Sequence, residues 1–174
     1  MDNLLRQTQT VLTTTANRWR DLTQSVSLEL LTQSPAPGEW SALECLQHLI
    51  DVEAVMRTRL EAFMAGRETF PGFNPDEQGT EVSEDLSLQA LGNKFVQLRA
   101  ENLELLAGLT PADYGRQATH GELGRVTLEQ MLHHWAAHDL NHTVQAEGAM
   151  LQQLIAGAGP WRQFYSDHIT DGSD

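Results

Sequence analysis

The chain has 174 residues, a length that suits one domain with a core large enough to fold without disulfides, and its single cysteine, Cys45, excludes an intramolecular disulfide. Its formal net charge of −13 comes from 24 acidic and 11 basic residues and repels the phosphates of nucleic acids and of anionic lipids. No apolar run approaches the roughly 20 residues of a membrane-spanning helix, so we expect a cytoplasmic protein without nucleic-acid or membrane partners.

Two segments with helical periodicity fill the first third of the chain. The first predicted helix runs from about Asn3 to Leu31, with apolar residues every three or four positions, and a proline-rich segment ends it. A capping box of Ser41 and Glu44 begins the second helix, in which the serine side chain and the glutamate side chain each satisfy a free backbone N–H group. Gly66 marks its predicted end.

Two further helices follow a long polar segment. Residues 70–85 are rich in Pro, Gly and Asp, and this composition predicts a long exposed loop. The third predicted helix spans residues 87–106. The fourth spans residues 127–155 and begins with a second capping box, formed by Thr127 and Gln130.

Shorter features complete the prediction. The linker of residues 108–126 holds one expected helical turn at residues 110–113, because proline is tolerated in a first turn. Aromatic residues in the tail from Gly157 predict a short helix that docks on the bundle, and residues 171–174 are expected to be disordered. No segment keeps the alternation of a strand, so we expect an all-α four-helix bundle within a single domain of residues 1–170.

Histidines are concentrated in the fourth predicted helix. Of the seven in the chain, two share a stripe that recurs at steps of four, three, four and three residues: Met131, Trp135, His138, His142 and Gln145. The stripe begins with apolar residues, so it faces the core. Residues four apart on a helix lie about 5–6 Å apart at Cβ, and two imidazoles at that spacing can chelate one metal ion.

A third inward histidine comes from the second predicted helix. His48 shares an apolar face with Val52 and Val55. Two readings of these inward histidines stay open from spacing alone: metal ligands, or core residues held by hydrogen bonds. His134 is also four residues from His138, but it falls at the edge of the stripe.

Three short motifs carry a resemblance to a known family. They are the segment Trp-Ser-Ala-Leu-Glu-Cys-Leu-Gln-His at residues 40–48, the segment Leu-Arg-Ala-Glu-Asn-Leu at residues 98–103, and the combination of Gly-Arg-Val-Thr-Leu at residues 124–128 with Trp-Ala-Ala-His-Asp-Leu-Asn-His at residues 135–142. With these motifs in this order, the sequence resembles the DinB/YfiT-like superfamily of metal-binding proteins.

The resemblance implies more than the spacing does. It implies a bundle of up-down-down-up order, a homodimer, and metal ligands at His48, His138 and His142 with coordination positions left open. The expected cofactor is one divalent metal ion, nickel or zinc first, with iron, manganese or copper as alternatives. Some members of the superfamily are thiol-dependent transferases or isomerases.

Two functions from different classes are consistent with such a site. The first is a metal-dependent enzyme, either a thiol S-transferase or a hydrolase, acting on a small thiol or another small molecule. The second is a non-catalytic, stress-associated metal-binding module, because no evident acid, base or nucleophile stands beside the ligands. A metal-free bundle with hydrogen-bonded histidines is the third reading.

Four acidic and basic residues near the histidines have simple interpretations. Asp51 and Asp139 have the chemistry to accept a hydrogen bond from a metal-bound imidazole, although a solvated helix face is the favoured interpretation of each. Glu53 is predicted to pair with Arg57, four residues on.

Five more residues complete the candidate list. Arg99 either pairs with a carboxylate inside the bundle, which we favour, or anchors an anionic substrate. His120 and Gln145 are candidates to line the mouth of the site. Trp40 and Trp135 are expected to serve as core and rim packing.

Overall fold

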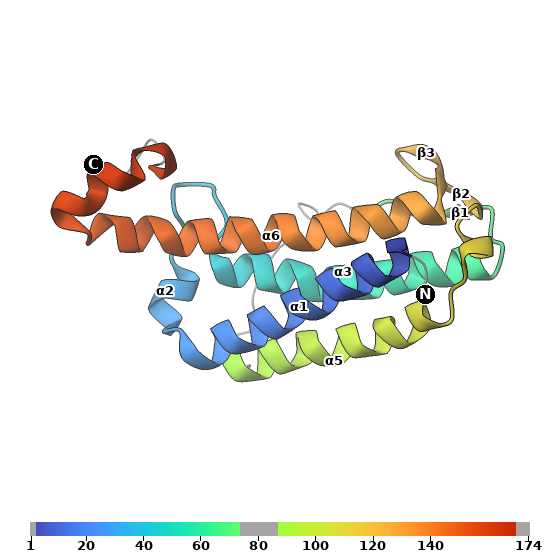
Figure 1. Cartoon of the computed structure of the whole chain (residues 1–174), viewed down its shortest axis with the longest axis horizontal. Coiled ribbons are helices and arrows are strands. Elements are labelled where there is room, and N and C mark those ends of the chain that lie inside the picture. The colour runs from blue at the N-terminus through green and yellow to red at the C-terminus, as the bar shows by residue number, and fades with distance from the viewer. Residues whose placement is uncertain (1–2, 74–86, 170–174) are drawn as a thin grey trace.

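Four long helices run side by side in the computed structural model, which describes residues 3–73 and 87–169. They are α1 (Asn3–Ser25), α3 (Ala42–Met64), α5 (Leu88–Ala107) and α6 (Leu128–Ala156). In Figure 1, α1 and α6 run from right to left and α3 and α5 run from left to right. This is the predicted up-down-down-up order.

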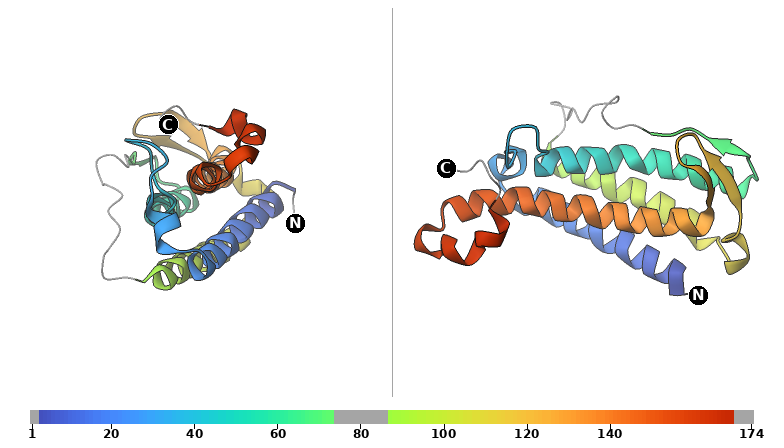
Figure 2. Two further views of the ribbon diagram at one scale, coloured as in Figure 1. Left: turned by 90° about the vertical axis from the view of Figure 1, so that its left-hand side faces the viewer. Right: turned by 90° about the horizontal axis from the view of Figure 1, so that it is seen from above.

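The packing of these helices closes the bundle. Helix α1 contacts α5 and α6, and α3 also contacts α5 and α6, so each long helix has two long neighbours. The end-on view in Figure 2 shows the same arrangement. None of the helices in the described ranges is long and apolar enough to span a membrane.

The helix boundaries follow the predicted caps, with one exception. Both capping boxes are present, Ser41 with Glu44 at α3 and Thr127 with Gln130 at α6. The prediction of one unbroken first helix is wrong, because the chain leaves the helix after Ser25 and restarts as α2 (Leu28–Thr32). Ser27 causes the restart, since its side chain accepts a hydrogen bond from the backbone of α2 and caps that helix.

A small sheet at one end of the bundle was not predicted from the sequence. Strand β1 (Thr69–Phe70) pairs in parallel with β2 (Gln117–His120), and β2 pairs antiparallel with β3 (Gly124–Thr127). Only β2 alternates between exposed and buried residues, over four positions. Strands this short carry too little periodicity to stand out in a sequence.

Two shorter helices occur where they were expected. Helix η1 (Pro111–Asp113) is the predicted turn of the linker, and η2 (Gly159–His168) follows α6. The aromatic residues of η2 do not dock into the core, because the exposed fractions of Trp161 and Phe164 are 68% and 71%. The predictions for residues 74–85 and 171–174 lie outside the described residues.

A polar layer divides the core into two apolar clusters. One cluster contains Leu12, Val52 and Trp135, and the other contains Trp19, Leu49, Phe95 and Ala146. At or next to the boundary between them lie buried polar residues, listed here in chain order: Thr15, His48, Glu53, Arg99, Asn102 and Asp139. The candidate site belongs to this layer, so the apolar clusters on either side hold its helices in place.

Candidate metal centre

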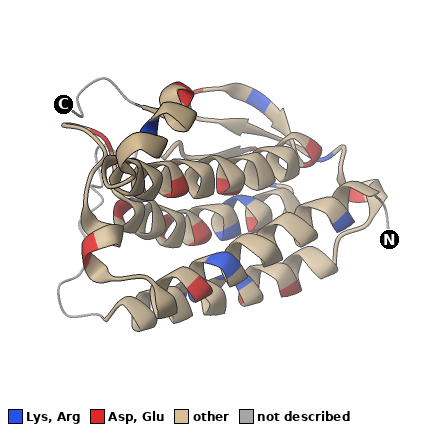
Figure 3. Cartoon of the chain, turned by 60° about the vertical axis from the view of Figure 1, so that its left-hand side comes forward, with Lys and Arg blue, Asp and Glu red and all other residues tan. Residues whose placement is uncertain are grey.

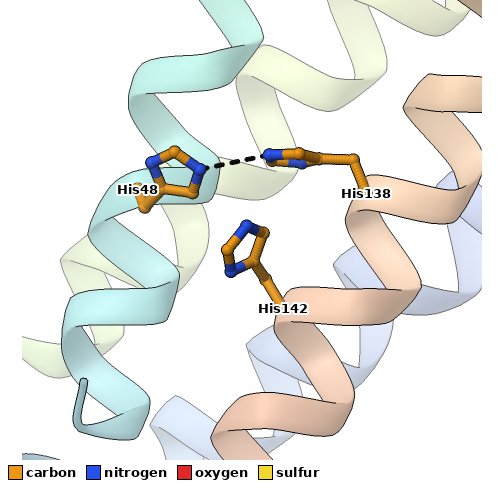
Figure 4. Close-up of side chains that lie close together, drawn as sticks. All are labelled: His48, His138 and His142. Atoms are coloured by element: carbon orange, nitrogen blue, oxygen red, sulfur yellow. Dashed lines mark hydrogen bonds between the residues drawn. The ribbon is translucent and has the colours of Figure 1, made fainter. Parts of the chain in front are cut away.

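Two antiparallel helices bring the three predicted histidines together. His48 lies on α3, and His138 and His142 lie on adjacent turns of α6, with all three rings pointing toward one another (Figure 4). One nitrogen from each ring lies within 4.8 Å of the other two. His134, the alternative partner of His138, stays outside this cluster, although its ring centroid is 5.6 Å from that of His138.

The spacing of one nitrogen pair fits a shared metal ion. Nε2 of His48 lies 3.1 Å from Nε2 of His138. Two ligands bound to zinc at 2.0–2.1 Å with a tetrahedral angle are about 3.3 Å apart, which is close to the observed separation. Without an ion, one of these nitrogens donates a hydrogen bond to the other, and a bound ion would take the place of that hydrogen.

Burial keeps the three imidazoles in the neutral form that binds metals. Burial, reinforced by the nearby His142, lowers the pKa of His48 to about 4. Burial and the neighbouring histidines lower the pKa of His138 to about 3. Burial also lowers the pKa of His142, while its hydrogen bond to Gln145 acts in the opposite direction. Near neutral pH all three rings therefore have a lone pair to offer.

One residue beside the cluster orients a ring. Nδ1 of His142 lies 2.9 Å from the side-chain oxygen of Gln145, and this oxygen can only accept, so Nδ1 carries the hydrogen. Nε2 of His142 is then unprotonated and free to bind an ion, as is usual for metal-ligating histidines. Nδ1 of His138 has no hydrogen-bond partner within the described ranges.

A cavity of about 580 Å³ opens onto the cluster. The three histidines line one end, together with Trp40, whose ring stacks on His142 at a centroid distance of 5.7 Å. His120 lines the other end, as expected of a residue at the mouth of the site. The cavity is large enough for a small organic molecule, and the histidines are exposed to it.

A closed network of ion pairs lies behind the histidines. Arg99 donates to Glu53 at 2.6 Å and to Asp139 at 2.7 Å, and each of these side chains is 1% exposed. Its remaining contacts include the carbonyl of Leu12 at 2.7 Å, and Asn102 donates to Glu53 at 2.8 Å. Arg99 therefore has the structural role favoured from the sequence, and it does not face the cavity.

This network corrects two of the sequence interpretations. Glu53 does not pair with Arg57, which contacts Glu61 and Glu101 instead. Asp139 is buried and does not lie on a solvated face. Each error arises because a helix periodicity does not identify the residues of the facing helices.

The two aspartates considered as partners of the histidines have other contacts. Asp139 is held by Arg99, and Asp51 accepts a hydrogen bond from Gln47 at 2.9 Å. Among the described residues, no carboxylate joins the histidine cluster.

Sequence reasoning missed several residues of the cavity, and Arg59 is the one for which the sequence held a signal. Arg59 lines the end away from the histidines and lies 3.1 Å from Nε2 of His120. A signal was present, since Arg59 follows His48 by eleven residues, about three helical turns, and so shares its inward face.

Comparisons with known proteins agree with the fold. The chain is similar to YfiT from Bacillus subtilis with a TM-score of 0.72 and 16% sequence identity, over 88% of this chain and 90% of that one. YfiT is described as a probable metal-dependent hydrolase with an unusual four-helix bundle topology. No curated protein sequence matches this chain. The model of the DinB superfamily matches residues 12–146, and the chain therefore belongs to the DinB superfamily.

Proposed function

We propose that this protein binds one divalent metal ion through His48, His138 and His142. The observation that carries the proposal is the convergence of three ring nitrogens within 4.8 Å, from residues whose neutral form is favoured by burial. Nickel and zinc are the first candidates, and iron, manganese and copper are the alternatives. Imidazole ligands suit nickel, zinc, iron and copper, whereas manganese binds more readily to oxygen ligands.

The site is proposed to be catalytic, and a small-molecule hydrolase is the activity that it supports best. A divalent ion held by three neutral imidazoles polarises a substrate oxygen and activates water or a thiol for nucleophilic attack. The cavity of about 580 Å³ favours this function over a structural ion, which is usually enclosed by four protein ligands. The description of YfiT as a probable metal-dependent hydrolase supports it further.

A proton acceptor is available on the cavity wall. His134 is one helical turn before His138 and lines the cavity. The residue is partly exposed, but desolvation of its ring, with the charge of Arg59 and the nearby His120, lowers its pKa, so the ring is neutral near pH 7 and able to take a proton. We assign His134 this role in the proposed reaction.

A thiol S-transferase is the second candidate. It is favoured by the absence of a carboxylate from the cluster within the described residues, because a thiol that loses its proton on binding needs no strong base. The expectations of a homodimer and of a cytoplasmic location stay predictions.

The metal proposal is tested by calorimetric titration of metal-free protein with zinc and with nickel. We expect one ion per chain, and roughly a hundredfold or greater loss of affinity in His138→Ala. The matched control is His134→Ala, one turn away, whose metal affinity should change less than threefold. Equal affinities in wild type and His138→Ala would refute the ligand assignment.

The catalytic proposal needs a separate assay. Metal-loaded protein is tested against a panel of small esters and amides, and against thiols paired with electrophiles. We expect turnover that is lost in His138→Ala and reduced in His134→Ala, although the latter keeps its metal. Turnover with thiols only would select the transferase, and metal binding without turnover in either panel would favour the non-catalytic, stress-associated module.

A further inference from the structure

The end of the cavity away from the metal-site histidines contains a buried arginine with an unused hydrogen-bond donor. Arg59 is 8% exposed, lies 5.6 Å from the centroid of the Phe70 ring and contacts Nε2 of His120. Its Nε–H group is buried and has no hydrogen-bond partner within the described ranges. At least one of the five N–H donors of this guanidinium is therefore left for a ligand.

No carboxylate of the described chain neutralises this arginine. Every ion pair of the described residues involves other basic side chains. Glu122, the nearest acidic influence on Arg59, is exposed, and its carboxylate packs against Gly72, where a Cβ would lie 2.7 Å from Oε1. An unpaired buried charge is costly, so a structure that keeps one is suited to a charged ligand.

The cavity has the opposite charge to the rest of the protein. The charged side chains among its described lining residues are Arg59, Arg125 and Glu122, and two positive charges less one negative leave a net charge of +1 before any metal ion is counted. The whole chain carries −13, and Figure 3 shows its acidic residues spread over the helices. A local positive charge inside an acidic molecule attracts anions to this cavity.

The position of Arg59 relates the anion to the proposed metal site. His48, Val52, Met56 and Arg59 lie along one face of α3, and all of them line the cavity. At 1.5 Å per residue, the Cα atoms of His48 and Arg59 are about 16 Å apart along the helix axis. Between these two polar ends the wall is largely apolar, with Val52, Met56 and Met131.

We propose that the ligand of this cavity is a small aliphatic or aromatic carboxylate, whose carboxylate group binds Arg59 while its reactive group lies beside the histidine cluster. The assignment of this ligand as a substrate rests on the proposed function of the metal site. A carboxylate matches the net charge of +1 that Arg59, Arg125 and Glu122 give the cavity wall without the metal ion, whereas a phosphate dianion would leave negative charge near Glu122. Arg59 is the residue that positions the substrate and selects its charge.

The proposal is tested with plain probes on metal-free protein kept in EDTA, so the result does not depend on metal binding. Hexanoate, hexanamide and hexyl phosphate are titrated by calorimetry. We expect hexanoate to bind wild type at least tenfold more tightly than hexanamide, because a charge-assisted hydrogen bond is lost with the amide. Arg59→Met should remove this preference. The matched control Arg57→Met, two residues earlier on α3 and not among the residues that line the cavity, should change it less than threefold.

A second measurement covers the case in which Arg59→Met does not fold. In wild type, the NMR signal of the Arg59 Nε–H group should shift downfield on addition of hexanoate and stay in place with hexanamide. Equal binding of hexanoate and hexanamide, or an unmoved Arg59 signal, would overturn the proposal, and tighter binding of hexyl phosphate would overturn the choice of a carboxylate.

The variant His138→Ala separates this inference from the proposed function. It should lose zinc binding and still prefer hexanoate over hexanamide. If wild type fails to bind metal but keeps the preference, the metal proposal fails and the carboxylate site stands. If wild type binds metal and shows no preference, only the carboxylate site fails.

Discussion

Two arginines are buried in the same bundle, and their surroundings differ. Arg99 has a carboxylate on each side, Glu53 and Asp139, and also donates to the carbonyl of Leu12. Within the described part of the chain, Arg59 has a hydrogen-bond contact to a histidine nitrogen and a buried Nε–H group without a partner. Burial alone lowers the pKa of Arg99, but Asp139 and Glu53 reverse this and raise it overall, whereas burial lowers the pKa of Arg59 with only Glu122 opposing.

The difference separates a structural polar cluster from a binding site. The Arg99 cluster satisfies its own charges and has no exposure to the cavity, so its role is to join α1, α3, α5 and α6. The histidine cluster and Arg59 keep unused nitrogen atoms and line the cavity. His138 and Asp139 are adjacent in sequence and belong to different clusters, because neighbouring positions of a helix face different directions.

Breaking the Arg99 ion pairs should have the largest effect on stability. Arg99→Met leaves Glu53 and Asp139 buried without a positive partner, and removing one partner of a buried ion pair costs about 3–5 kcal/mol. The free energy of unfolding from urea denaturation measures it. The matched control, Arg59→Met, replaces an unpaired buried charge with an apolar side chain and should leave stability unchanged or slightly higher. Equal losses in the two variants would show that the two arginines do not differ as described.

A smaller effect is expected from removing the hydrogen bond that orients the ring of His142 in the histidine cluster. Gln145→Leu removes the acceptor of the His142 Nδ1–H group, and loss of such a partner lowers metal affinity by about 10- to 100-fold. Zinc titration by calorimetry measures it. Gln145→Glu keeps an acceptor oxygen and should retain most of the affinity. An unchanged affinity in Gln145→Leu would mean that Gln145 does not orient His142 for metal binding.

The smallest effect concerns the pH dependence of the metal-free protein between pH 7 and pH 6. In the folded state the pKa values of His48 and His138 are about 4 and 3, below the unfolded value near 6.5. The unfolded state therefore takes up protons first, so stability is complete above pH 6.5 and falls as the pH drops toward 4. Between pH 7 and pH 6 the loss is less than about 1 kcal/mol per histidine.

Denaturation in EDTA at several pH values measures this dependence. A His48→Phe/His138→Phe double variant should lose stability less steeply than wild type over the same range, because two of the depressed groups are gone. Parallel curves for the two proteins would contradict the assignment of the pH dependence to this cluster.

Local sequence determined the helices and the direction in which most side chains point. Capping residues such as Ser41 and Thr127 place the helix starts within one residue, because a cap acts on the backbone next to it. The inward direction of His138 and His142 follows from the period of a single helix. Ser27 shows the limit of such reasoning, since it lies within a continuous apolar pattern and yet begins a new helix.

Tertiary structure alone decided which inward residues meet. Glu53 contacts Arg99 on another helix and not Arg57 on its own, and Asp139 joins them, because packing of α3, α5 and α6 brings these positions to one level of the bundle. The sheet that brings His120 to Arg59 depends on pairing between segments about fifty residues apart. Contacts between elements depend on their relative rotation and register, and the periodicity of one element contains no information about either.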